Sequence, residues 1–191
     1  MKRRFDECLT LIESKKVRDF VVNALAFAPK EFWSAPNSDG GKDNVEGGII
    51  IHSLKVVRLI INFCDFFGIS EQLTRDKLIA AGVLHDVQRN GIPWGANAHP
   101  EHGHIAAQWL LLLRSFEASS LEDLYFNTDK DLIDIIELVE NHMGPRNKPY
   151  PTSALRKVKE GVENKEGYLV DEKAIWHLIV QMADYLASIG I

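Results

Sequence analysis

Apolar residues recur at intervals of three and four along most of this chain, which is the spacing that places side chains on one face of an α-helix. No stretch of strand length alternates strictly between apolar and polar residues. The pattern therefore predicts an all-α fold, a helical bundle. With 191 residues the chain can bury one core, and no low-complexity stretch or long linker divides it, so we expect a single domain over residues 1–191.

The helical spacing is interrupted at positions rich in glycine, proline, asparagine and aspartate, which set the expected boundaries. The expected helices are a pair within 3–28 and single helices at about 48–67, 71–87, 101–116, 127–142, 153–161 and 172–188. The loop SAPNSDGGKDNVEGG after the first pair contains Gly-Gly-Lys but not the full G-x-x-x-x-G-K-[ST] pattern, and no strand precedes it. We interpret it as a surface connection or a lid.

Charge and cysteine content exclude several classes of protein. A net charge of −5 with scattered Lys and Arg provides no basic stripe for long nucleic acid. No apolar run approaches the roughly 18 residues of a membrane span, and no apolar signal core follows the basic N-terminus, so a cytoplasmic protein is expected. Cys8 and Cys64 lie far apart and outside any C-x-x-C spacing, which indicates buried thiols.

Imidazoles and carboxylates occur in apolar contexts on several of the expected helices. They are His52, His85 with Asp86, one of the cluster His99, His102 and His104, then His142 and Asp184. Any one of them alone is more typical of a hydrogen-bonded core residue than of a ligand. Burying them together without a partner would be costly, and a metal ion relieves that cost. Nitrogen and oxygen ligands together favour Fe, Mn, Zn, Co or Ni over Ca.

The order of these residues resembles the HD superfamily of metal-dependent phosphohydrolases and phosphodiesterases, which are all-α proteins. IIIHSLKVV and GVLHDV are similar to the family's first His and its His-Asp doublet, and ADYLAS is similar to its final Asp motif. The resemblance implies that one metal ion is held by His52, His85, Asp86 and Asp184. It runs over a motif-bearing core of about 48–187, preceded by N-terminal helices and a loop at 1–47.

Two further stretches, HGHIAAQWL and ELVENHMG, resemble the family's helices that supply two more histidines. The resemblance then implies a second ion held by His102 and His142, with Asp86 bridging the two. Whether one or two ions bind stays open, as does the identity of the divalent metal, with Mg included. His99, within HPEHG, remains an alternative to His102. Asn141-His142 and MGPRNKPYP replace the motifs of the cyclic-dinucleotide phosphodiesterase branch, so that activity is not expected.

The activity implied by the resemblance is hydrolysis of a nucleotide or another small phosphorylated substrate by a metal-activated water. Asp86 would orient the metal and the water and take the proton. Arg89 would bind a phosphate oxygen through its planar fork, and Arg146 or Lys148 could do the same. Two alternatives remain, a di-iron oxygenase of the same superfamily and a regulatory or binding module that keeps the metal without turnover. The apolar helices could provide a homodimer face.

Overall fold

The helices expected from the apolar spacing are present in the computed structural model, which describes residues 2–37, 44–117, 129–144 and 172–191. In chain order the elements are α1 (Lys2–Leu9), α2 (Lys15–Ala26), the 3-10 helix η1 (Lys30–Trp33), α3 (Gly48–Phe66), α4 (Gln72–Leu84), α5 (His102–Glu117), α7 (Lys130–Glu140) and α9 (Glu172–Ile189). These residues form helices and no strand, which confirms the predicted all-α fold. The helix expected near 153–161 lies outside the described residues.

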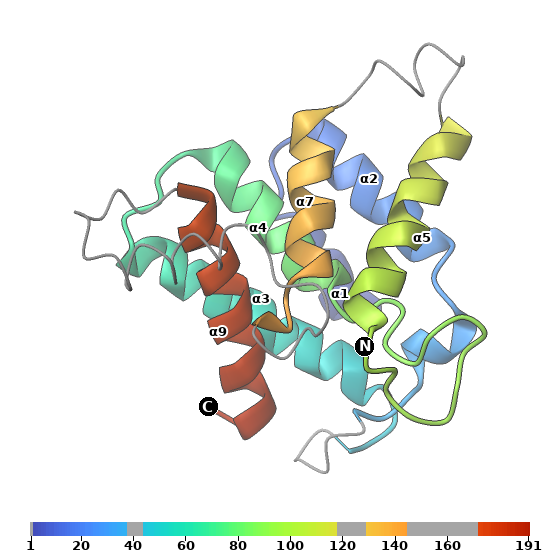
Figure 1. The fold of residues 1–191 in the computed structure, drawn as a ribbon. Coiled ribbons are helices and arrows are strands. Elements are labelled where there is room, and N and C mark those ends of the chain that lie inside the picture. The colour runs from blue at the N-terminus through green and yellow to red at the C-terminus, as the bar shows by residue number, and fades with distance from the viewer. Residues whose placement is uncertain (1, 38–43, 118–128, 145–171) are drawn as a thin grey trace, which may run out of the picture.

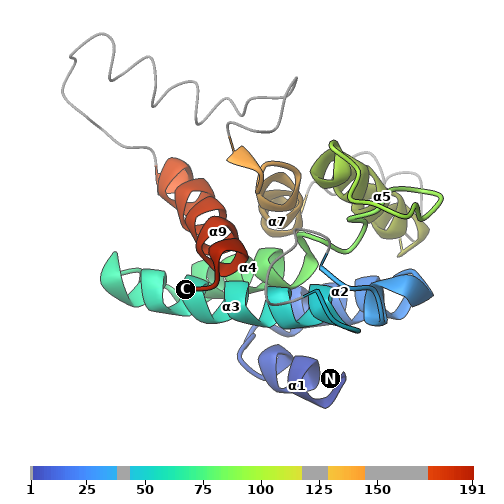
Figure 2. The same ribbon diagram turned by 90° about the horizontal axis from the view of Figure 1, so that it is seen from below.

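The helices form two layers (Figures 1 and 2). Helices α5, α7 and α9 lie over a layer made by α2, α3 and α4, and α1 lies on the other side of that layer. Helix α9 packs most extensively on α3, while α7 packs on both α4 and α5. The buried core between the layers includes Ile49, Ile60, Leu84 and Ile135. In the described part of the chain, no helix combines the length and the apolar character needed to cross a membrane.

Helix α4 ends earlier than the sequence suggested. We expected it to continue to about 87, but its last residue is Leu84 and His85 is its C-cap. A series of turns then runs through Gly91, which has a φ of +84°. His85 and Asp86 therefore lie where the chain leaves the helix, and both side chains are buried.

A buried ion pair connects three of the helices. The Lys77 Nζ atom of α4 lies 3.0 Å from the Asp134 Oδ2 atom of α7, and both side chains are buried. The same ammonium group lies 4.6 Å from the ring centroid of Trp176 on α9. On the other side, the Lys173 Nζ atom lies 2.6 Å from Asp134 Oδ1. Asp134 therefore neutralises two ammonium groups in the packed region between α4, α7 and α9.

The two cysteines are not bonded to each other. Cys64 is buried and Cys8 is half-buried, and both are free thiols. The prediction of buried thiols is therefore met at Cys64 and only partly at Cys8.

Candidate metal centre

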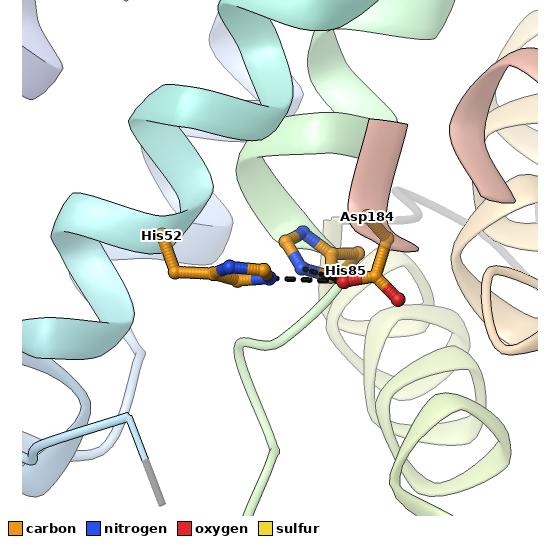
Figure 3. A group of neighbouring side chains, drawn as sticks. All are labelled: His52, His85 and Asp184. Carbon is orange, nitrogen blue, oxygen red and sulfur yellow. Dashed lines mark hydrogen bonds and ion pairs between the residues drawn. The ribbon is translucent and has the colours of Figure 1, made fainter. Parts of the chain in front are cut away.

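Three helices bring together a first group of candidate ligands, His52, His85 and Asp184 (Figure 3). His52 comes from the second turn of α3, His85 from the end of α4 and Asp184 from α9. The His52 Nε2 atom lies 2.9 Å from Asp184 Oδ1, and His85 Nε2 lies 3.8 Å from the same oxygen. Both imidazoles are fully buried. Two nitrogens and one carboxylate oxygen thus face a common point in the interior.

The hydrogen bonds of His85 orient its ring toward this group. Its Nδ1 atom donates to the Gly82 carbonyl oxygen at 2.8 Å, so Nε2 faces Asp184 and carries the lone pair whenever the ring is neutral. Within the described chain this buried Nε2 atom has no hydrogen-bond partner. Buried polar atoms are normally paired, and a histidine that binds a metal usually donates its other N–H to a carbonyl or carboxylate. The ring of His85 therefore fits the role of a metal ligand.

The second group of candidate ligands consists of Asp86, His102 and His142. His102 begins α5 and His142 follows the end of α7, and their Nδ1 atoms each donate to a backbone carbonyl three residues earlier at 2.7 Å. Their Nε2 atoms lie 3.0 Å apart. Because both Nδ1 atoms donate to carbonyls, each Nε2 atom presents a lone pair when its ring is neutral, and the two Nε2 atoms hydrogen-bond to each other only while one ring is protonated.

The spacing of these two nitrogens matches shared coordination of one ion. Two nitrogens about 2.1 Å from an ion and at a right angle to each other lie about 3.0 Å apart. Burial and the neighbouring imidazoles of His102 and His85 lower the pKa of His142 to about 3. His142 is therefore neutral at physiological pH, which is the form that binds a metal.

Asp86 belongs to the second group but also faces the first, with one carboxylate oxygen toward the histidines of each group. Its Oδ1 atom lies 3.1 Å from His102 Nε2 and 3.8 Å from His142 Nε2. Its Oδ2 atom lies 3.4 Å from His85 Nε2 and 3.9 Å from His52 Nε2. This is the arrangement expected of a carboxylate that bridges two ions.

The charge of Asp86 is kept by its surroundings. The buried Arg89 guanidinium donates from Nη1 to Asp86 Oδ2 at 2.6 Å. Although burial raises it, the charges of Arg89 and His85 hold the pKa of the Asp86 carboxyl well below its usual range. Burial likewise opposes ionisation of Asp184, but its hydrogen bond with His52 lowers the pKa of that carboxyl. Both carboxylates are therefore ionised and available to a cation.

Gly103 allows α5 and α7 to approach closely beside the second group. A β-carbon at this position would lie 2.6 Å from the Glu140 carbonyl oxygen and 3.2 Å from that of Val139. Both atoms belong to backbone, so the helices must move apart to admit it. We expect Gly103→Ala to lower the free energy of unfolding by about 1–3 kcal/mol. It should also lower the affinity of the second group for metal, because His102 and His142 lie on the two helices that separate.

Denaturation in urea and metal titration of the variant would test this. Gln108→Ala, which changes an exposed residue of the same helix, is the control and should change neither quantity. A Gly103→Ala variant with the stability and metal affinity of the wild type would show that the close helix contact does not hold the two histidines in place.

The six ligands expected from the sequence, four histidines and two aspartates, all lie together in these two groups. Of His99 and His102, the two alternatives for the same ligand position, His102 is the one that lies next to Asp86. His99 lies outside both groups, and its Nδ1 atom accepts a hydrogen bond from the Glu101 amide at 3.2 Å. His104 pairs with Glu140 at 2.7 Å. Arg146 and Lys148, expected to bind phosphate, lie outside the described residues.

Comparison with protein-family models identifies the chain. A model described as the HD domain matches residues 49–189. The chain belongs to the HD-domain family. The match confirms the resemblance drawn from the His, His-Asp and Asp motifs, and it places the chain in a superfamily of metal-dependent phosphohydrolases whose domains bind divalent metals. Neither the curated proteins nor the solved structures contained a match to this chain.

A pocket of about 330 Å³ lies beside the ligand groups of this HD domain. His142 and Asp184 form part of its wall. The other lining residues are Met143, Leu178, Gln181, Met182, Tyr185 and Ser188. The sequence analysis did not find this set. Helical spacing could have predicted part of it. Gln181, Tyr185 and Ser188 lie three or four residues from Asp184 or from one another, which places them on the same side of α9.

Proposed function

We propose that this HD domain hydrolyses a phosphoric ester of a small molecule and uses one or two divalent metal ions to do so. The observation that carries the proposal is the position of Asp86, a single ionised carboxylate with one oxygen toward each of two histidine-containing groups. Sites built this way suit phosphate esters because two positive charges can flank one phosphoryl group.

In this proposal each candidate ligand has a defined place. His52, His85 and Asp184 would hold one ion, His102 and His142 the other, and Asp86 would bridge them; the donor set is compatible with Fe, Mn, Zn, Co, Ni or Mg. When bound, the ions lower the pKa of water and neutralise charge on the phosphoryl oxygens.

The chain's own groups would handle the proton and the substrate. The water oxygen bonds to phosphorus as the bond to the ester oxygen breaks, which releases an alcohol and phosphate. Asp86 accepts the proton that the water loses and passes it to the departing ester oxygen, so the organic product leaves as the neutral alcohol. Arg89 fixes the Asp86 carboxylate through its 2.6 Å contact and supplies positive charge for the phosphoryl oxygens. Arg146 and Lys148, which follow His142 in the sequence, are proposed as additional phosphate ligands.

A di-iron oxygenase is the second candidate. The observation that favours it is the ligand set itself, because the four histidines and two aspartates that such an enzyme needs lie together. The identity of the bound metal separates the two candidates, since only the oxygenase requires iron.

The first experiment is elemental analysis of the wild type and of His102→Ala, both purified without added metal. We expect about two metal equivalents in the wild type and about one in the variant, because the first group keeps its ligands. His104→Ala is the control, since His104 pairs with Glu140 outside both groups and its loss should leave the metal content unchanged. Each protein is also assayed for phosphate release, directly from phosphomonoesters and in the presence of an added phosphomonoesterase for phosphodiesters, because a diester itself yields a phosphomonoester.

Each outcome has a distinct meaning. Phosphate release that depends on the bound metal supports the hydrolase. Iron alone, with oxygen consumption and no phosphate release, would support the oxygenase. Metal without either reaction would indicate a binding or regulatory module, and protein that binds no metal when ions are supplied would overturn the proposal.

A further inference from the structure

We propose that the pocket on α9 receives the organic part of the substrate and selects for a group that carries a ring or other apolar surface. The inference rests on the proposed function, because it takes the ester bond to lie at the two ligand groups. It adds which class of phosphate ester the site accepts. It assigns a specificity role to Met143, Leu178, Gln181 and Tyr185.

The pocket is continuous with the reaction site. His142 of the second ligand group and Asp184 of the first both line it, so one end of the pocket is formed by both groups. An ester held there by its phosphoryl group would direct its organic part along α9. The pocket volume of about 330 Å³ lies at the lower end of the range for small-molecule sites and is sufficient for one ring with its substituents.

The chemistry of the wall determines what fits. Among the lining residues that the structure describes, those other than Asp184 and His142 contribute thioethers, a leucine, a phenol, an amide and a hydroxyl. Leu178 and Tyr185 remain 42% and 49% exposed, which leaves apolar surface open beside a strongly polar centre. Such surface at a pocket commonly marks a ligand site. Methionine side chains adapt their shape to a flat or irregular apolar group.

Strongly polar organic groups are poorly matched to the described part of this wall. A polyol would leave the leucine and methionine surfaces without apolar contact. Gln181 supplies a neutral amide whose Nε2 donates to the Asn141 carbonyl oxygen at 3.3 Å, which orients that amide in the wall. The described lining therefore favours a partly apolar group.

The test compares two esters that differ only in the ring. 2-Phenylethyl phosphate and ethyl phosphate have leaving alcohols of similar acidity, so a difference in kcat/KM reports contacts with the ring. We expect the metal-loaded wild type to prefer the phenyl compound by at least about tenfold. Leu178→Gln, which places an amide on this wall, should reduce that preference by roughly threefold to tenfold. Ile189→Gln is the control, because Ile189 is exposed on the same helix but does not line the pocket.

A binding measurement separates this inference from the proposed function. Calorimetric titration with 2-phenylethylphosphonate and methylphosphonate needs no turnover. Preferred binding of the phenyl compound, weakened by Leu178→Gln but not by Ile189→Gln, supports the pocket even if no ester is hydrolysed. Equal hydrolysis of the two esters together with equal binding of the two phosphonates would overturn the inference and leave the hydrolase proposal standing.

Discussion

Replacing Asp86 by asparagine is expected to lower kcat/KM for the best phosphate ester substrate by roughly a thousandfold or more. The carboxylate presents Oδ1 to one ligand group and Oδ2 to the other. An amide keeps the shape of the side chain but loses one of these oxygens and the negative charge. The substitution therefore weakens metal binding by both ligand groups at once. The metal content should fall in parallel, and elemental analysis of the purified variant measures this without reference to any substrate.

Asp19→Asn is the control for this change. Asp19 is exposed on α2 and pairs with Lys15 one helical turn away, so its replacement should leave activity and metal content unaltered. Circular dichroism of the Asp86→Asn variant is needed as well, because the buried Arg89 loses the charge of its partner. A correctly folded variant that retains kcat/KM within about tenfold of the wild type would exclude a bridging role for Asp86.

Replacing Asp134 by alanine is expected to lower the free energy of unfolding by about 3–5 kcal/mol. The change removes the nearer carboxylate of both the buried Lys77 ammonium and the Lys173 ammonium. Lys77 then keeps only the longer contact with Asp131 at 3.5 Å, and Lys173 keeps Glu137 at 3.3 Å. A buried charge that loses its partner costs far more than an exposed one, because water cannot replace the lost interaction. Urea denaturation in the presence of a chelator measures the effect without a contribution from bound metal.

Asp65→Ala supplies the comparison. Asp65 forms a 2.8 Å ion pair with Arg75, but its side chain is 65% exposed, so the cost should be below about 1 kcal/mol. Equal losses in the two variants would show that Lys77 reaches solvent when Asp134 is absent. Replacing both partners, as in Lys77→Met with Asp134→Leu, should recover most of the lost stability since no buried charge remains.

The sequence predicted the parts of this fold that depend on local periodicity. The apolar spacing in α3, α7 and α9 extends over several turns, so their existence could be inferred without knowing their neighbours. The end of α4 was misplaced because no glycine or proline follows Leu84 before Gly91, so nothing local marks a boundary, whereas the helix ends at Leu84 and His85 and Asp86 are buried directly after it. Tertiary contacts of that kind are not encoded in spacing.

The candidate ligands could be listed from the sequence, but their arrangement could not. HPEHG offers His99 and His102 three residues apart, and either could face inward as long as the start of the helix is unknown. In the structure α5 begins at His102, and the ring is held by the His99 carbonyl oxygen. The pairing of Lys77 with Asp134 was missed for a different reason. Each lies among apolar residues, which hints at burial, but contact between residues 57 positions apart requires the packing of α4 on α7.

The sequence distances within the two ligand groups imply an order of assembly during synthesis. His52 and Asp184 are 132 residues apart, so their contact forms only after α9 has been made, whereas His102 and His142 are 40 residues apart. Chains emerge from the ribosome N-terminus first. The group around His102 can therefore assemble while α9 is still unsynthesised, and a nascent chain at that stage holds His52 and His85 without their carboxylate partner on α9. Docking of α9 on α3 is the step that completes the centre.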